Sequence, residues 1–187
     1  MNSTFQWNYK FMYDFAKIHP EISWVVKPHP LLLKQAVNKK IFPTAESCEE
    51  YFKKWIDTEY KGYTLNEESK CVDTERGDHV RSKSEKIIAD KLLLMDIPYH
   101  YEKPLILSDR TIYPDFTVLN KRTKQEYYYE HFGMMDNPEY ARNAIAKINF
   151  YIRHNILPGI KLLFSFETSD KPISSFVIEK IIKEYLI

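Results

Sequence analysis

Two acidic residues stand at positions where carboxylates are uncommon. Asp115 lies inside the segment IYPDFTV (112–118), which has the composition of a strand, although aspartate is depleted in strand interiors. Glu130 lies near the end of the next strand-like segment, residues 125–132. Antiparallel neighbours joined by a short turn bring such residues side by side. Two carboxylates at so short a distance repel each other unless a cation or a proton lies between them. The pair therefore predicts a cation-binding site.

Glu85 is the third candidate acid. It heads an apolar stripe that includes Ile88 and Leu92 on a predicted helix, so its side chain is expected to point toward the sheet. Three converging carboxylates suit a hard cation, Mg²⁺ or Mn²⁺. Each acid also has a structural interpretation: a first-turn glutamate favoured by the helix dipole, a turn cap at Asp115, or an exposed strand-end acid at Glu130. Their combination on these elements favours the metal site.

The elements that would position these acids are predicted from hydrophobic periodicity and turn signals. Their order in the second part of the chain is α-β-β-β-α-β-α. A strand meander followed by helix-strand-helix predicts a mixed α/β layer around one sheet. The expected helices span 82–95, capped by Ser82 or Ser84, and then 138–155 and 174–186; the expected strands span 99–107, 111–119, 125–132 and 160–166.

Composition indicates a globular, cytoplasmic chain. Hydrophobic residues make up 44% of its 187 residues, and the net charge of +1 counts mildly against tight nonspecific binding of nucleic acid. Two cysteines suggest neither a disulfide scaffold nor a four-cysteine zinc site. The sequence contains no apolar run long enough for a membrane span, and its first residues do not resemble a signal peptide.

The chain divides into two parts that differ in composition. Residues 1–66 hold all three tryptophans and predict a small α/β fragment, and residues 67–79 form a polar stretch interpreted as a linker. Residues 80–187 are expected to fold without the first part. The elements expected in the first part are a helix at 7–18, a strand at 22–26, a turn at 27–30 and a helix at 45–58 capped by Thr44.

The acidic motif resembles that of a known family. Tyr-Pro-Asp (113–115), then Glu-His-Phe-Gly (130–133), with Glu85 upstream, resembles the PD-(D/E)XK nuclease superfamily. The resemblance covers residues from about 81 to 187 and includes the element order, since the family core is α-β-β-β-α-β. It implies a restriction-endonuclease-like core with a mixed sheet. It also implies hydrolysis of DNA phosphodiester bonds by a metal-dependent nuclease, with DNA as the partner.

The same resemblance implies roles for individual residues. Asp115 and Glu130 would be metal ligands, Glu85 an auxiliary ligand, and the carbonyl of His131 the group that completes the coordination. The family usually carries lysine two residues after the second acid, where this chain has Phe132.

Lys147 is the candidate that would replace this lysine. It shares a helix face with Tyr151 at spacing i, i+4, which resembles the Gln-x-x-x-Tyr motif of exonuclease-like branches with lysine in the glutamine position. We expect its ammonium to lie within reach of Asp115 and Glu130, directly or through one water. Lys147 as a solvated surface residue beside a core Tyr151 is the alternative, and His131 is then the next basic candidate.

The first part of the chain resembles a different family. Trp-Val-Val-Lys-Pro-His-Pro-Leu (24–31) resembles a segment of the CDP-glycerol glycerophosphotransferase family, over residues of about 3–65. His29 is the one residue to which this resemblance would assign a functional role.

Three functions are therefore kept: a metal-dependent nuclease, a nucleic-acid-binding module with a degraded site, and a remnant of a glycerophosphotransferase. A homodimer is possible in each case.

Overall fold

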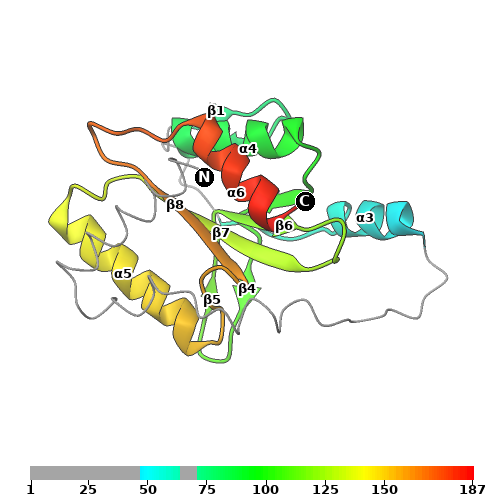
Figure 1. Cartoon of the computed structure of the whole chain (residues 1–187). Coiled ribbons are helices and arrows are strands. Elements are labelled where there is room, and N and C mark those ends of the chain that lie inside the picture. Colours follow the sequence, from blue (N-terminus) through cyan, green and yellow to red (C-terminus); the bar gives the residue numbers. More distant parts are fainter. Residues whose placement is uncertain (1–46, 64–70) are drawn as a thin grey trace.

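The computed structural model describes residues 47–63 and 71–187 (Figure 1). This part of the chain is a mixed α/β structure in which helices cover both faces of a four-stranded sheet. The prediction of a mixed α/β architecture around a central mixed sheet is confirmed at this level. The expected helix at 7–18, strand at 22–26 and turn at 27–30, with His29 and the cap Thr44, lie outside the described residues.

The central sheet has the order β3-β6-β7-β8. β3 pairs with β6, and β6 with β7, in antiparallel register, whereas β7 and β8 are parallel. The parallel pair is possible because helix α5 (Pro138–Arg153) crosses over between the two strands. The strands are β3 (Tyr99–Tyr101), β6 (Phe116–Leu119), β7 (Glu126–Phe132) and β8 (Leu162–Phe166).

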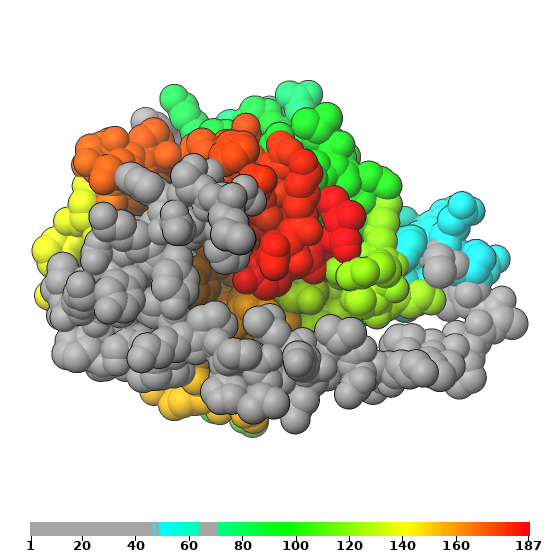
Figure 2. Space-filling view, viewed as in Figure 1, coloured from blue at the N-terminus to red at the C-terminus, as the bar shows by residue number. Residues whose placement is uncertain are grey.

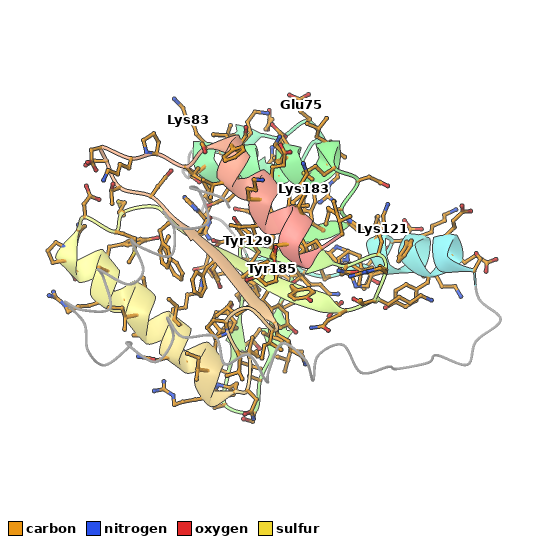
Figure 3. All side chains as sticks on the ribbon, in the orientation of Figure 1. Glu75, Lys83, Lys121, Tyr129, Lys183 and Tyr185 are labelled. Atoms are coloured by element: carbon orange, nitrogen blue, oxygen red, sulfur yellow. The ribbon has the colours of Figure 1, made fainter. Side chains whose placement is uncertain are left out.

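Alternation along β7 assigns its side chains to the two faces of the sheet. Tyr129 packs into the core beneath helices α4 (Lys83–Leu94) and α6 (Ser175–Tyr185), as Figure 3 shows. Tyr128 and Phe132 pack on the other face, against α5 (Pro138–Arg153). Glu130 lies between these two in the alternation and therefore belongs to the α5 face. Figure 2 shows α6 lying against α4 over the first face.

The helices start at polar caps that the sequence supplies. The Ser82 hydroxyl accepts a hydrogen bond from the Glu85 N–H at 3.1 Å, which fixes the start of α4 and confirms Ser82 rather than Ser84 as the cap. Asn137 caps α5 and is followed by Pro138 at the first helical position, where its missing N–H costs nothing. These caps fix where α4 and α5 begin, and the buried residues of each helix then face the sheet.

Two of the expected strands are wrong as continuous elements. Residues 99–107 break after Tyr101, because Glu102 takes a positive φ of 48° and Pro104 cannot donate to a ladder. Residues 111–119 break at Tyr113–Asp115, where Pro114 interrupts pairing. The distal halves form a separate two-stranded ladder, β4 (Leu105–Ile106) with β5 (Thr111–Ile112). Both breaks fall at the same level of the sheet, next to Asp115.

Part of the expected linker, residues 67–79, is folded. β1 (Val72–Asp73) and β2 (His79–Val80) form an antiparallel pair, and both contact α4. Thr74 accepts from the Gly77 N–H in the turn between them, and Gly77 has a φ of 94°, which favours glycine. The polar composition of this segment therefore belongs to a hairpin turn, while Val80 is fully buried.

The helix expected at 45–58 is α3 (Cys48–Ile56), and its cap is Ser47 in a capping box with Glu50. Trp55 on α3 is buried, and its indole donates to Glu126 Oε1 at 2.5 Å. Its carbonyl lies 2.8 Å from His100 Nε2. The segment 47–63 therefore packs against β3 and reaches the first residue of β7. In the described part of the chain, every helix is too short or too polar to cross a membrane.

Candidate functional site

Asp115 and Glu130 lie at the point where the β6–β7 ladder ends. The last paired residues are Phe116 and Tyr129, so the register continues to Asp115 opposite Glu130. Both carboxylates are buried, with residue exposures of 6% and 1%. Asp115 Oδ2 accepts a hydrogen bond from the His131 N–H at 2.7 Å, and this bond ties the two strands together beyond their ladder. The chain thus places two acids side by side below its surface.

Helix α5 supplies the partners of Glu130. Lys147 Nζ donates to Glu130 Oε2 at 2.6 Å, and the Tyr151 hydroxyl donates to Oε1 at 2.5 Å. The two donors are one helical turn apart, as their i, i+4 spacing requires. The ammonium of Lys147 therefore lies within direct reach of the acids, as the sequence led us to expect, and Tyr151 is buried beside it.

Burial and like charge dominate the electrostatics of the pair. Burial, followed by the charge of Glu130, raises the pKa of Asp115 to about 7, although Lys147 and the His131 N–H act in the opposite direction. Burial alone would lower the pKa of Lys147, but Glu130 and Asp115 outweigh it, and the pKa lies above its ordinary value. Burial and the neighbouring Glu130 also raise the pKa of Tyr151. Near neutral pH the site therefore holds a lysine cation and an aspartate that readily takes up a proton.

Arg81 and Glu102 are site residues that the sequence did not single out. Arg81 Nη2 lies 2.6 Å from Glu102 Oε1 and 3.7 Å from Asp115 Oδ1. The Glu102 N–H donates to the Asp115 carbonyl at 3.1 Å, and Glu102 is only 3% exposed. Burial raises the pKa of Glu102, while Arg81 lowers it. The one signal available in the sequence was the Glu-Lys-Pro triplet (102–104) in a strand-like segment, because proline cannot donate to a ladder and so ends the strand there.

Glu85 lies next to this second ion pair. Its Oε2 accepts from the Arg81 N–H at 2.9 Å and from the Tyr101 hydroxyl at 2.7 Å. It is buried and faces the sheet, as expected. Within residues 47–63 and 71–187, however, no three His, Cys, Asp or Glu side chains converge as a group that could hold a metal ion. The structure thus brings Asp115 and Glu130 together and holds Glu85 in its own hydrogen bonds.

The site has more buried negative charge than positive charge. Glu85, Glu102, Asp115 and Glu130 are each less than 9% exposed. Arg81 and Lys147 are the cations that pair with them in the described residues. Two negative charges are thus left over when all four acids are ionised, which makes the cluster a place for protons or for an added cation.

The His131 imidazole points to the other face of the sheet. Its Nδ1 lies 2.8 Å from Ser165 Oγ, and its Nε2 lies 3.3 Å from Glu167 Oε1 without hydrogen-bond geometry. Glu167 also accepts from the Ser84 hydroxyl at 2.7 Å, so the network ties α4 to β7 and β8. The Gly133 backbone leaves little space there, since an added Cβ would lie 3.3 Å from Glu167 Oε1. Only the backbone of His131 therefore contacts the acidic pair.

Neither of two comparisons with known proteins found a match: no protein-family model matches this sequence, and no curated protein matches it. The function must therefore be argued from the site.

Proposed function

We propose that the chain is a divalent-metal-dependent phosphodiesterase that hydrolyses DNA, with a restriction-endonuclease-like core. One observation carries the proposal: Asp115 and Glu130 lie opposite each other at the broken end of β6, with the Lys147 ammonium 2.6 Å from Glu130. The element order α4-β3-β6-β7-α5-β8, with the small β4–β5 ladder inserted after β3, supports it, because the core of the PD-(D/E)XK superfamily has the order α-β-β-β-α-β.

The donor chemistry fits Mg²⁺ or Mn²⁺. Both cations prefer oxygen ligands, and Mg²⁺ is commonly held by one or two carboxylates together with water and substrate phosphate. Asp115, Glu130 and the His131 carbonyl would hold the ion. Such an ion supplies charge stabilisation at the phosphate and a more acidic bound water. Two carboxylates are enough protein acids for such an ion. Glu85 would therefore not bind the metal but would position Arg81 through the hydrogen bond from the Arg81 N–H.

The protein's own residues would have distinct roles in this proposal. Lys147 is 37% exposed on its side chain, so its ammonium can stabilise negative charge on an attacked phosphate while it remains bound to Glu130. Tyr151 holds the second oxygen of Glu130 and fixes the orientation of that carboxylate. The His131 N–H does the same for Asp115.

A digestion assay with linear, nicked and branched DNA in Mg²⁺ and in Mn²⁺ tests the proposal. The purified chain should degrade at least one substrate, and EDTA should stop the reaction. The matched variants are Lys147→Met and Lys183→Met, which make the same change at the site and on the outer side of α6, where Lys183 pairs with Glu179 (Figure 3). No cleavage of any substrate by folded wild-type protein would refute the proposal.

A nucleic-acid-binding module without catalysis is the second candidate. Phe132 at the motif lysine position favours it, as does the lack of a three-acid ligand group among the described residues. It predicts DNA binding with no cleavage in either metal. The glycerophosphotransferase alternative depends on His29 and its neighbours, which lie outside the described residues.

A further inference from the structure

The two cations of the site differ from its acids in exposure. The side chains of Arg81 and Lys147 are 42% and 37% exposed, whereas those of Glu102, Asp115 and Glu130 are 4%, 9% and 1% exposed. The carboxylates thus form the floor of the site, and the guanidinium and ammonium are the charged groups that solvent reaches. An anion that approaches the floor meets these two cations first.

Arg81 and Lys147 come from different elements and pair with different acids. Arg81 precedes α4 and pairs with Glu102, and Lys147 lies on α5 and pairs with Glu130. Arg81 Nη2 is also 3.7 Å from Asp115 Oδ1, and the charges of Glu130 and Lys147 act on the pKa of the same carboxyl, Glu130 raising it and Lys147 lowering it. Asp115 therefore lies between the two ion pairs, and a ligand held by both cations would sit over Asp115.

The backbone of Arg81 is fixed. Its N–H donates to Glu85 Oε2 at 2.9 Å and lies 3.2 Å from the Tyr101 hydroxyl. The Glu102 carboxylate pairs with the guanidinium, with Glu102 Oε1 2.6 Å from Arg81 Nη2. A guanidinium has five N–H donors in a planar fork, so its contacts with Glu102 and the Tyr101 hydroxyl leave donors for a second oxyanion. Such a preorganised, half-exposed fork suits the two non-bridging oxygens of a phosphodiester.

We infer that Arg81 is a phosphodiester-binding residue, positioned by Glu102, that holds a nucleic-acid backbone phosphate over Asp115. The inference rests on the proposed function for its substrate class. It explains how a chain with a net charge of only +1 and a cluster of buried acids can receive a polyanion: the few cations that matter are gathered at the surface of the site. It also gives Glu102 and Glu85 a use that does not require either to bind metal.

The test separates binding from cleavage. The probe is a short, fluorescently labelled DNA duplex, and the readout is its dissociation constant by anisotropy, in Ca²⁺ and again in EDTA. Arg81→Gln alone would leave the buried Glu102 carboxylate unpaired and could unfold the chain. The main variant is therefore the double substitution Arg81→Gln with Glu102→Gln, which removes both members of the ion pair and keeps the net charge constant.

The control is Arg122→Gln, in the turn between β6 and β7 at the opposite end of these strands from Asp115. The double variant should raise the dissociation constant about tenfold, the loss typical of a hydrogen bond to a charged group. Its plot of log affinity against log salt should be less steep by about one phosphate contact. Arg122→Gln should bind as tightly as the wild type. Glu102→Gln keeps the guanidinium but removes the carboxylate that positions it, so it should lose less affinity than the double variant. Arg81→Lys should recover part of the loss.

Wild-type affinity in the folded double variant would overturn the inference, and so would an equal loss in Arg122→Gln or a wild-type chain that binds no duplex. The proposed function fails separately. A chain that binds DNA through Arg81 but cleaves nothing supports the inference and refutes the nuclease. A chain that cleaves DNA, and whose double variant binds DNA as tightly as the wild type, supports the nuclease and refutes the role of Arg81.

Discussion

Replacement of Asp115 by asparagine should stabilise the protein at alkaline pH and leave it nearly unchanged at mildly acidic pH. Burial and Glu130 raise the pKa of Asp115 from 3.8 to about 7 in the folded chain. The folded state therefore binds a proton more tightly than the unfolded state does. Its stability is highest below the unfolded pKa and is lost as the pH rises toward 7. Above that value the ionised carboxylate destabilises the fold.

The magnitude follows from the same pKa. Each pKa unit corresponds to about 1.4 kcal/mol, so the ionised Asp115 costs about 4 kcal/mol above pH 7 and about 1–2 kcal/mol at pH 5. Asparagine removes this cost but weakens the bond from the His131 N–H, a loss of about 1–2 kcal/mol. The net gain is about 2 kcal/mol at pH 8, which raises Tm by about 4–8 °C for a chain of this size, and about zero at pH 5.

Thermal unfolding followed by circular dichroism at pH 5 and pH 8, without divalent metal, measures both values. Thr117→Ser, two residues after Asp115 in β6, serves as the control, because it removes a methyl group near the site without a change of charge. The electrostatic account would be refuted if Asp115→Asn destabilised the chain equally at both pH values. That result would mean that the carboxylate contributes through its hydrogen bond alone.

Four further outcomes are expected. Asp115→Ala and Glu130→Ala should each abolish metal-dependent cleavage of DNA while the circular dichroism spectrum stays that of a folded chain; normal activity in either would remove it from the site. Lys147→Met should reduce turnover about 100-fold, the usual loss when one preorganised charge donor is removed, and Mn²⁺ affinity measured by calorimetry should change far less. Mn²⁺ at a hundredfold excess over its Kd should stabilise the wild type by about 2.7 kcal/mol at pH 8 and so raise its Tm. The Tm of Asp115→Asn should not rise; equal shifts in the two proteins would mean that the ion binds elsewhere. Trp55→Ala should cost about 3–5 kcal/mol in urea unfolding, and a fragment of residues 71–187 should fold with a lower midpoint than the full chain; an unchanged midpoint would show that α3 adds nothing to the sheet edge.

Several features of the fold and the site followed from local sequence. Alternation along residues 126–132 separates Tyr129 from Glu130, because successive strand side chains point to opposite faces. The i, i+4 spacing of Lys147 and Tyr151 puts both on one side of α5, where they hold the two oxygens of Glu130. The caps and apolar stripes of the helices depend on residues three or four apart. Each of these constraints acts within a few residues, so one segment is enough to predict it.

Other features depended on residues distant in the chain. Glu102 became a site residue because the chain breaks there at a positive φ and because Arg81, from before α4, reaches it. The hairpin at 72–80 also differed from its sequence prediction, since both of its strands pack against α4. The motif acids were visible because of their neighbours in sequence. The charges that pair with these acids could not be predicted in this way, because only the tertiary structure determines which carboxylates are buried close together and which cations remain exposed beside them.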